Sequence, residues 1–385
     1  RPGTVQQGTL TLSQQSGLGV SLTHALTEAV RFLSENTIAV LALNQLDIDA
    51  INSVPGLCRR PSDCLVSAAP GLARDMAGNA IDVVPAFAAS AVIRDVTAPS
   101  LQSFRLSMTD EILSLEFNEV INTTQVAAAL EETGGTSLSA QLMSMNSSVA
   151  HQGNTTFVSL APVAVMDGGL SRIVTVELSE EIVFTLQLAE DIATDAANTW
   201  LQLSTASDVV DVAGNGPEPV LLQAAEVEAD FNQPEVVSFS IDMATGHLQL
   251  FFSEPIRAST VDVAAITLLG SEEAHGASLN LTSEDCEVDA ANGLQVMLVF
   301  SAQGLNRVKA VRDLFESNSS SLIAFTAALA ADMAGNAVAV PSSPLRASNY
   351  AADTNQPRLV AFDLNRDKGE LTLVFNETVV GSTLN

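Results

Sequence analysis

The stretch from Asp230 to Glu254, DFNQPEVVSFSIDMATGHLQLFFSE, contains the pattern that decides the fold. Its second half places Leu248, Leu250 and Phe252 at alternate positions, and residues 243–246 before them have the composition of a turn. Alternation puts these side chains on one face of a strand, and two strands joined by a short turn form a β-hairpin. The stretch therefore predicts an antiparallel hairpin.

The same pattern occurs three times along the chain. Each copy has an Asp, three further residues, a Pro, an aliphatic residue and a Phe, and nine residues beyond the Phe comes a strand of the form Leu-x-Leu-x-Phe-x-Glu. The copies begin at Asp95, Asp230 and Asp353 and end at Glu119, Glu254 and Glu377. A turn-like pentapeptide, Asp-x-Ala-Gly-Asn, begins about twenty residues before each copy, at Asp75, Asp211 and Asp332. The sequence is therefore expected to be a tandem repeat.

We take the Asp before each Pro as the boundary between repeats. This places a truncated first repeat at 1–95, a second at 96–230, a third at 231–353 and the beginning of a fourth at 354–385. A period above about 120 residues is too long for a solenoid unit and fits an independently folded domain. Many short strands with turn signals favour a β-sandwich. The sequence predicts an all-β chain of Ig-like sandwiches arranged end to end.

One segment departs from the strand pattern. Repeats one and three align without a gap upstream of the pentapeptide, so that Ile51 corresponds to Val308 and Leu57 to Leu314. Residues 307–315 have apolar side chains at helical spacing, which predicts a short helix or helical turn there. Everything else has the pattern of strand and turn.

The composition indicates a folded and strongly acidic chain. Of the 385 residues 47% are hydrophobic, and 45 Asp and Glu against 16 Lys and Arg give a formal net charge of -29. Such a surface repels nucleic acid and anionic membranes, so divalent cations or basic partners are the expected counterparts. No apolar run reaches the length of about 18 residues that a membrane span needs. Because the chain begins at Arg1 and stops within a strand pattern, we expect both ends to be cuts in a longer protein.

The carboxylates at the repeat boundaries are candidate metal ligands. In repeat three the hairpin returns the chain, so Glu254 is expected near Asp230, where the repeat began. If one strand occupies most of the residues after Asn336, Asp332 also lies at that end, and repeat two follows the same geometry. Like charges at such distances repel unless a cation or proton intervenes, and carboxylate oxygens suit Ca²⁺ at extracellular levels. The candidate ligands are Asp95, Glu119, Asp211, Asp230, Glu254, Asp332, Asp353 and Glu377.

An alternative to calcium binding stays open. Each Asp could cap a turn through its own backbone while the Glu accepts hydrogen bonds from a neighbouring loop. Two strands after the pentapeptide would carry Asp332 to the opposite end and dissolve the cluster. No cofactor besides Ca²⁺ is expected.

No catalytic site is expected from this sequence. The four histidines are scattered without metal-ligand spacing, and motifs of zinc proteases, nucleophile elbows and phosphate-binding loops are absent. The histidines are His24, His151, His247 and His275. The sequence therefore favours a protein that is not an enzyme.

The pentapeptide, the Asp-x-x-x-Pro boundary and the Leu-x-Leu-x-Phe-x-Glu strand together resemble the tandem Ig-like repeats of very large secreted or surface proteins. These include bacterial adhesins and long repeat proteins of algae and protists, and in outline the pattern is similar to cadherin ectodomains. The resemblance implies a structural repeat in a surface, matrix or flagellar-hair-like fibre, with other repeats or other fibre and surface proteins as partners. An adhesin or receptor for a protein or glycan is the second hypothesis. Such sites are rich in Trp and Tyr, and this chain has only Trp200 and Tyr350, which favours the scaffold.

Cysteines and glycosylation motifs point to an extracellular or cell-surface location. Cys58 and Cys64 have a spacing that closes easily into a disulfide in an oxidising compartment, although a pair of buried thiols is the alternative. Cys286 could pair with another chain or remain a free thiol. Six Asn-x-Ser/Thr motifs predict N-linked glycans, at Asn122, Asn146, Asn154, Asn280, Asn318 and Asn376.

Overall fold

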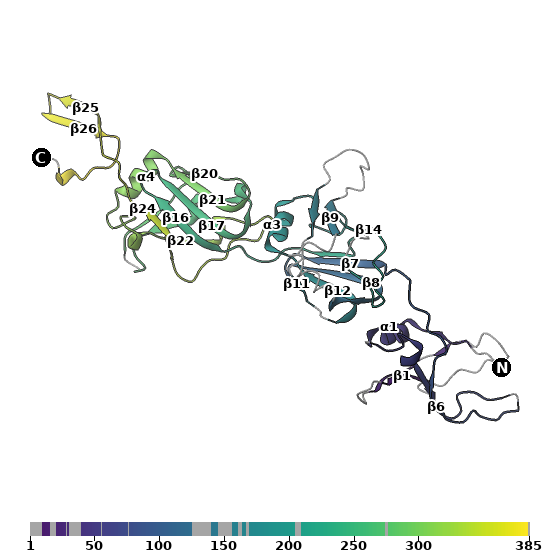
Figure 1. The fold of residues 1–385 in the computed structure, drawn as a ribbon. Helices are drawn as coiled ribbons and strands as arrows, with labels where there is room; N and C mark the ends of the chain where they lie inside the picture. Colours follow the sequence, from purple (N-terminus) through teal and green to yellow (C-terminus); the bar gives the residue numbers. More distant parts are fainter. Residues whose placement is uncertain are drawn as a thin grey trace, which may run out of the picture. The chain divides into compact units, whose positions relative to one another are not determined.

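The structure of the protein is a computed structural model, which describes residues 10–15, 21–27, 29–30, 40–54, 56–75, 77–124, 140–144, 156–160, 164–166, 169–204, 209–273 and 276–383. The chain divides into two compact units (Figure 1). The first unit contains residues 1–182 and 192–228, and the second contains 183–191 and 229–385. Both units consist mainly of strands, with short helices between some of the strands. The prediction of an all-β fold is therefore confirmed.

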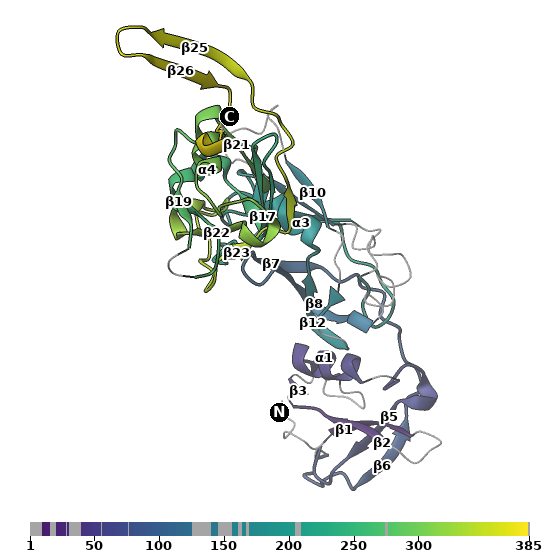
Figure 2. The ribbon, with the colours of Figure 1, turned by 90° about the vertical axis from the view of Figure 1, so that its left-hand side faces the viewer.

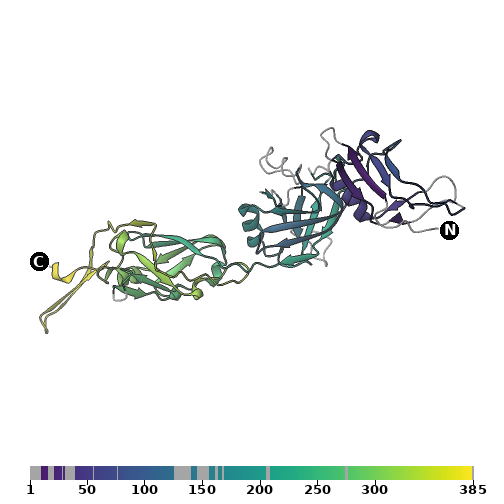
Figure 3. The same cartoon turned by 90° about the horizontal axis from the view of Figure 1, so that it is seen from below.

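The second unit contains a sandwich of two sheets that lie face to face (Figure 3). Side chains of the first sheet, such as Phe239, Leu250 and Val296, share one buried core with Leu268 and Ile323 of the second. The first sheet has the order β20 (Cys286–Asp289), β21 (Gly293–Phe300), β17 (His247–Ile256), β16 (Val236–Asp242), β24 (Asn349–Ala351). The second has the order β19 (Ser278–Asn280), β18 (Ile266–Leu269), β22 (Leu322–Phe325), β23 (Leu345–Arg346).

The first unit contains two sets of strands. One set occupies residues 101–228 and forms two sheets. The first sheet has the order β11 (Ala164–Val165), β12 (Leu170–Glu177), β8 (Ile112–Asn122), β7 (Leu101–Ser107), β15 (Glu226–Glu228). The second sheet has the order β10 (Phe157–Ser159), β9 (Ala140–Ser144), β13 (Thr199–Leu203), β14 (Val220–Gln223). The other set precedes it, as the sheet β2 (Ser21–Ala25), β1 (Leu10–Gln15), β5 (Leu65–Ala68), β6 (Val84–Ala88) and the pair β3 (Ala29–Val30), β4 (Ala42–Leu43). Among the described residues, every strand pairing stays within one of the ranges 10–88, 101–228, 236–351 and 359–375.

The three predicted hairpins are present and share one register. Phe104 lies opposite Leu115 in β7 and β8, and Phe239 lies opposite Leu250 in β16 and β17. The third hairpin joins β25 (Leu359–Asn365) to β26 (Glu370–Phe375) (Figure 2). It pairs Phe362 with Leu373. The prediction of a repeated hairpin is confirmed, and the structure adds that the three hairpins pair corresponding residues.

After the pentapeptide the chain crosses the sandwich once. In repeat three the crossing consists of two short strands rather than one, because β23 joins the second sheet and β24 then joins the first. β24 runs parallel to β16, with Ser240 opposite Asn349, and therefore leads away from the end where β16 began. β15 pairs with β7 in the same parallel manner in repeat two. A single crossing leaves the pentapeptide at the starting end of each repeat.

The helices differ from the prediction. The helix expected over 307–315 lies earlier, as α4 (Ala302–Lys309), because the Ser301 side chain caps its first turn by accepting the Gly304 N–H. Its counterpart in repeat one is α1 (Gln45–Ser53). Repeat two has a helix that the strand interpretation missed, α3 (Glu180–Leu188). None of the helices that the structure describes is long and apolar enough to span a membrane.

Single-turn 3₁₀ helices complete the described secondary structure. They lie at Pro61–Asp63, Ala258–Thr260, Val263–Ala265, Asn318–Ser320, Ala327–Leu329 and Gly381–Thr383.

The loop after the helix supports the alignment of repeats one and three. Cys58 has a φ of 53° and its aligned residue, Phe315, has a φ of 56°, and both lie in the left-handed region. The Cys58 N–H donates to the Asp63 carbonyl, and the Phe315 N–H donates to the Ser320 carbonyl. The two loops are therefore the same structure built with different side chains.

Candidate functional site

The pentapeptide forms the same turn in all three copies. In the second copy the Asp211 carboxylate accepts the backbone N–H of Asn215 on Oδ1 (2.8 Å) and the side-chain Nδ2 of Asn215 on Oδ2 (2.7 Å). The fourth residue, Gly214, has a φ of 88°, a conformation that glycine adopts without steric cost. Asp75 and Asp332 make the corresponding bonds to Asn79 and Asn336. The motif therefore holds its Asp in one fixed orientation.

The same asparagine ties the turn to the boundary Asp of its repeat. Nδ2 of Asn336 also donates to the main-chain carbonyl of Asp230 (2.9 Å), and Nδ2 of Asn215 donates to that of Asp95 (3.3 Å). The first and last segments of each repeat are brought together by this amide.

A β-bridge then sets the pentapeptide beside the strand that carries the Glu. Ile256 pairs with Asp332, and Ile121 pairs with Asp211. Each Ile follows the Glu by two residues, so that the Glu side chain points to the same face of the strand. Glu254 and Glu119 are thereby directed at the two Asp residues of their repeat.

These contacts create two carboxylate clusters. The first cluster is Asp95, Glu119 and Asp211, and the second cluster is Asp230, Glu254 and Asp332. In each cluster one oxygen from every residue lies within 4.8 Å of the others, and five of the six residues are buried. The convergence expected from the hairpin and the single crossing is therefore present in both repeats.

Burial and repulsion between carboxylates raise the pKa values of the two glutamates in the clusters. Burial raises the pKa of Glu254 to about 8, and the charges of Asp230 and Asp332 add to this effect. Burial likewise raises the pKa of Glu119 to about 7, with contributions from Asp95, Asp211 and Asp49. Three carboxylates at these distances cannot all be ionised cheaply without a counter-charge.

A helix supplies an amide to each cluster. Gln187 of α3 donates from Nε2 to Asp230 Oδ2 (2.8 Å) and to Glu254 Oε2 (3.1 Å). Asn52 of α1 lines the small pocket of the first cluster, together with Arg59, Val212 and Ala213. The Arg59 guanidinium donates to the carbonyl of Asn52 (3.4 Å). Both amides are neutral, so neither adds positive charge to its cluster.

Among the described residues, buried side-chain oxygens without a hydrogen-bond partner lie at both clusters and also at Glu377 of the third boundary. Glu119 is only 8% exposed, and its Oε1 has no hydrogen-bond partner among the described residues. Oε1 of Gln187 is buried at the second cluster and is unpartnered in the same sense. Buried polar oxygens without a donor are costly, and Glu119 Oε1 is therefore an acceptor that the described residues leave unfilled.

At the third boundary an ammonium takes part. Nζ of Lys309, at the end of α4, lies 2.6 Å from Asp353 Oδ2 and 3.1 Å from Glu377 Oε2. Hydrogen bonds and the charges of these two carboxylates raise the pKa of Lys309, although burial alone would lower it. The prediction grouped Asp353 and Glu377 with the metal ligands, but a side-chain cation already bridges them, so this pair is excluded from the proposed cation sites below.

Sequence reasoning identified the carboxylates and missed the helix residues. Asn52, Gln187 and Lys309 contact or line boundaries whose Asp lies about forty residues further along the chain. The sequence did contain a signal for these three residues, because each lies eight positions after a helix-capping residue. The signal was missed because repeat two was not predicted to contain a helix.

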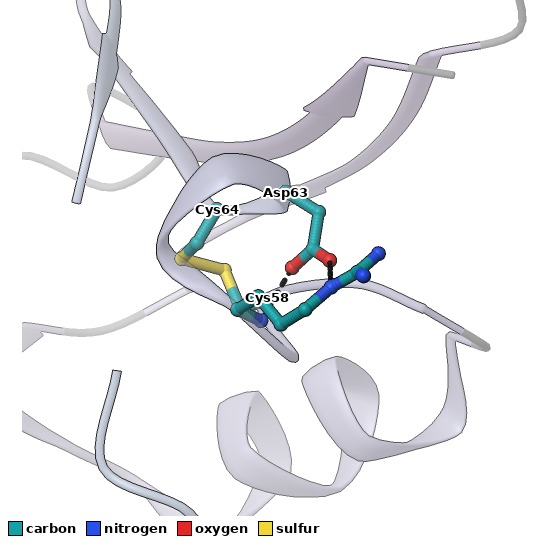
Figure 4. The surroundings of a disulfide bond; sticks show 4 residues. Cys58, Asp63 and Cys64 are labelled. Atoms are coloured by element: carbon teal, nitrogen blue, oxygen red, sulfur yellow. Dashed lines mark hydrogen bonds and ion pairs between the residues drawn. A yellow bond between two sulfur atoms is a disulfide. The ribbon is translucent and has the colours of Figure 1, made fainter. Parts of the chain in front are cut away.

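The disulfide predicted from spacing is present, between Cys58 and Cys64 (Figure 4). Asp63 stabilises the same loop by accepting the backbone N–H and the side-chain Nε of Arg60. Cys286 is a buried free cysteine, and burial raises the pKa of its thiol to about 12. The alternative in which Cys286 bonds to another chain conflicts with this burial.

The glycosylation motifs fall in different environments. Asn280, Asn318 and Asn376 are exposed, whereas Asn122 is half-buried. The Asn318 Nδ2, where a sugar would attach, donates to the Ala347 carbonyl (3.1 Å). Asn146 and Asn154 lie outside the described residues, as do His151 and His275.

Comparison with known proteins does not identify a family for this chain. No protein-family model matches the chain, and no curated protein does. A solved structure that it resembles is the N-terminal part of the bacterial S-layer protein SbsC, with 12% sequence identity and a TM-score of 0.19. The match covers 54% of this chain and 45% of that chain. A likeness this weak carries no argument about function.

Proposed function

We propose that this chain is a non-catalytic, structural region of a large extracellular protein, in which Ca²⁺ ties the ends of each β-sandwich repeat together. The observation that carries the proposal is the recurrence of one construction in two repeats. In both, a boundary Asp, a strand Glu and a pentapeptide Asp are brought within 4.8 Å by the same asparagine and the same β-bridge.

The chemistry of the clusters fits a hard divalent cation. Ca²⁺ takes carboxylate oxygens at about 2.3–2.6 Å and completes its shell with water or carbonyl oxygens. Oxygens no more than 4.8 Å apart can all reach one such ion. The orphaned Glu119 Oε1 supplies an acceptor that no donor occupies. A disulfide in the first unit supports an oxidising, calcium-rich compartment.

Binding of calcium to the full chain tests the cation sites. Isothermal titration should find two Ca²⁺ per chain, and calcium should raise the melting temperature above that in chelator. Glu119→Gln and Glu254→Gln should each remove one site. Glu116→Gln and Glu235→Gln are matched controls, since both glutamates are exposed and lie outside the clusters, and they should retain both sites. An unchanged melting temperature in chelator would refute calcium binding.

Electron microscopy of the parent protein tests the structural role. A fibre or a string of domains is the expected appearance. A compact, receptor-like particle would instead favour the adhesin hypothesis.

A further inference from the structure

At the second and third repeat boundaries, a side chain from the last turn of a helix meets the boundary Asp and the strand Glu, and the second boundary has Asp332 as a further carboxylate. At the second boundary Gln187 donates to Asp230 and Glu254, and at the third Lys309 donates to Asp353 and Glu377. The distances are 2.8 and 3.1 Å for the amide, and 2.6 and 3.1 Å for the ammonium. A neutral donor in one place and a charged donor in the other thus meet the same two carboxylates.

The helix caps show that these residues are equivalent. Each helix is preceded by a side chain that accepts the backbone N–H three residues further on. The capping residues are Asn44, Ser179 and Ser301, and the eighth residue after each is Asn52, Gln187 and Lys309. The repeat therefore has one helix position that faces the boundary carboxylates.

Charge at this position differs among the boundaries. Lys309 is largely buried, with 13% of its side chain exposed, and places one positive charge between two carboxylates. The second cluster has three carboxylates and an uncharged amide. Positive charge at the second cluster must then come from solution.

We propose that the residue at this helix position determines whether a repeat boundary takes a divalent cation, with Lys309 acting as a built-in cation and with Asn52 and Gln187 adding no positive charge to their carboxylates. The inference rests on the cation sites proposed above. The residue at this helix position contributes charge rather than ligand oxygens. One chain would then contain both metal-dependent and metal-independent boundaries.

The second cluster offers the cleaner test. Arg59 lines the first cluster and could supply charge there, whereas the arginine near the second, Arg257, is engaged by Glu190 and by the Met333 carbonyl. The variant is Gln187→Lys in the full chain, titrated with CaCl₂. It should bind one Ca²⁺ instead of two, and the melting of the second unit in chelator should rise towards that of the calcium-loaded wild type.

Gln187→Met is the matched control, because it has a similar length and removes the amide without adding charge. It should still bind two Ca²⁺. A cooperative melting transition of the second unit, which contains residue 187, reports that Gln187→Lys is folded. Loss of a site in Gln187→Met as well would show that the amide, not the charge, matters, and would overturn the inference.

Lys309→Gln gives an independent arm. Removing the ammonium should lower the melting temperature of the second unit in chelator, and millimolar CaCl₂ should restore part of the loss, while Lys309→Arg should melt like the wild type. A Lys309→Gln variant that melts like the wild type in chelator would contradict the proposed role. If the wild type binds no calcium, both proposals fail; if it binds two and Gln187→Lys also binds two, only this inference fails.

Discussion

At the residue scale, the glutamates of the two clusters are the most perturbed groups of the repeat. Glu254 and Glu119 come from alternating strands whose core-facing parity buries them, and the turn motif then places two further carboxylates beside each. Burial in the company of like charge makes an ionised glutamate unfavourable, so its proton or a cation must be retained. Glu254 is the clearer case, with a pKa of about 8.

Stability without divalent cations is predicted to fall as the pH rises. Unfolded glutamates have released their protons above a pKa of 4.5, whereas folded Glu119 and Glu254 hold theirs until about 7 and 8. The folded state therefore binds more protons in this window, and each group contributes a slope of at most about 1.4 kcal/mol per pH unit. Denaturant unfolding in chelator from pH 5 to 9 should show the decline. Glu254→Gln should flatten it and Glu235→Gln should not; a flat wild-type profile would contradict the prediction.

At the scale of elements, the hairpin is the common unit of the repeats, but its surroundings differ. Phe239 and Phe362 occupy the same register position, opposite Leu250 and Leu373. Phe239 is fully buried between the two sheets, whereas Phe362 is 64% exposed in a hairpin that pairs only with itself among the described residues. A second sheet packs over the hairpin of Phe239, whereas the described residues include no second sheet over the hairpin of Phe362.

Substituting each of these two phenylalanines by alanine should show how much stability depends on packing rather than on the sequence pattern. Phe239→Ala should cost about 3–5 kcal/mol, because it leaves a cavity in a closed core. Phe362→Ala, its register partner, should cost no more than about 0.5 kcal/mol. Calorimetry of the full chain measures both as shifts in the melting of the second unit. Equal costs would show that the third hairpin is packed in this chain.

At the scale of the whole molecule, the exposed motifs for N-linked glycans distinguish an extracellular chain from an intracellular one. Asn280 lies in the short strand β19 and Asn376 directly follows β26, and both side chains are exposed. Asn280 accepts a hydrogen bond from the Thr267 hydroxyl on Oδ1, and Asn376 accepts one from the Arg358 N–H on Oδ1. These bonds do not use Nδ2, the atom to which a sugar attaches.

Glycosylation is therefore predicted at Asn280 and Asn376, with lower occupancy at Asn122 and Asn318. Asn122 is half-buried, and the Asn318 Nδ2 is hydrogen-bonded to Ala347. Mass spectrometry of peptides from the native protein, treated with a glycosidase in labelled water, would give the occupancy of each motif. Unmodified asparagines together with free thiols at Cys58 and Cys64 would count against the extracellular proposal.

The sequence by itself determined the local elements of this protein. Alternation and turn composition predicted the hairpins, and the repeated Asp-x-Ala-Gly-Asn motif predicted the turn between Asp332 and Asn336. The register that places Phe239 opposite Leu250 was found in the structure. The hairpins and the turn depend on contacts within about twenty residues, so periodicity and turn chemistry are sufficient to predict them. The same local reasoning placed Glu254 near Asp230, because a hairpin must return the chain.

Tertiary structure alone decided which charges the boundaries receive. Lys309 meets Glu377, and Gln187 meets Glu254, across separations of more than sixty residues. Nothing in the local sequence of a short helix states which carboxylate its last turn will face. The packing of the helix at the end of a sandwich determines which carboxylate the last turn faces. The choice between a built-in ammonium and an ion from solution therefore exists only in the folded chain.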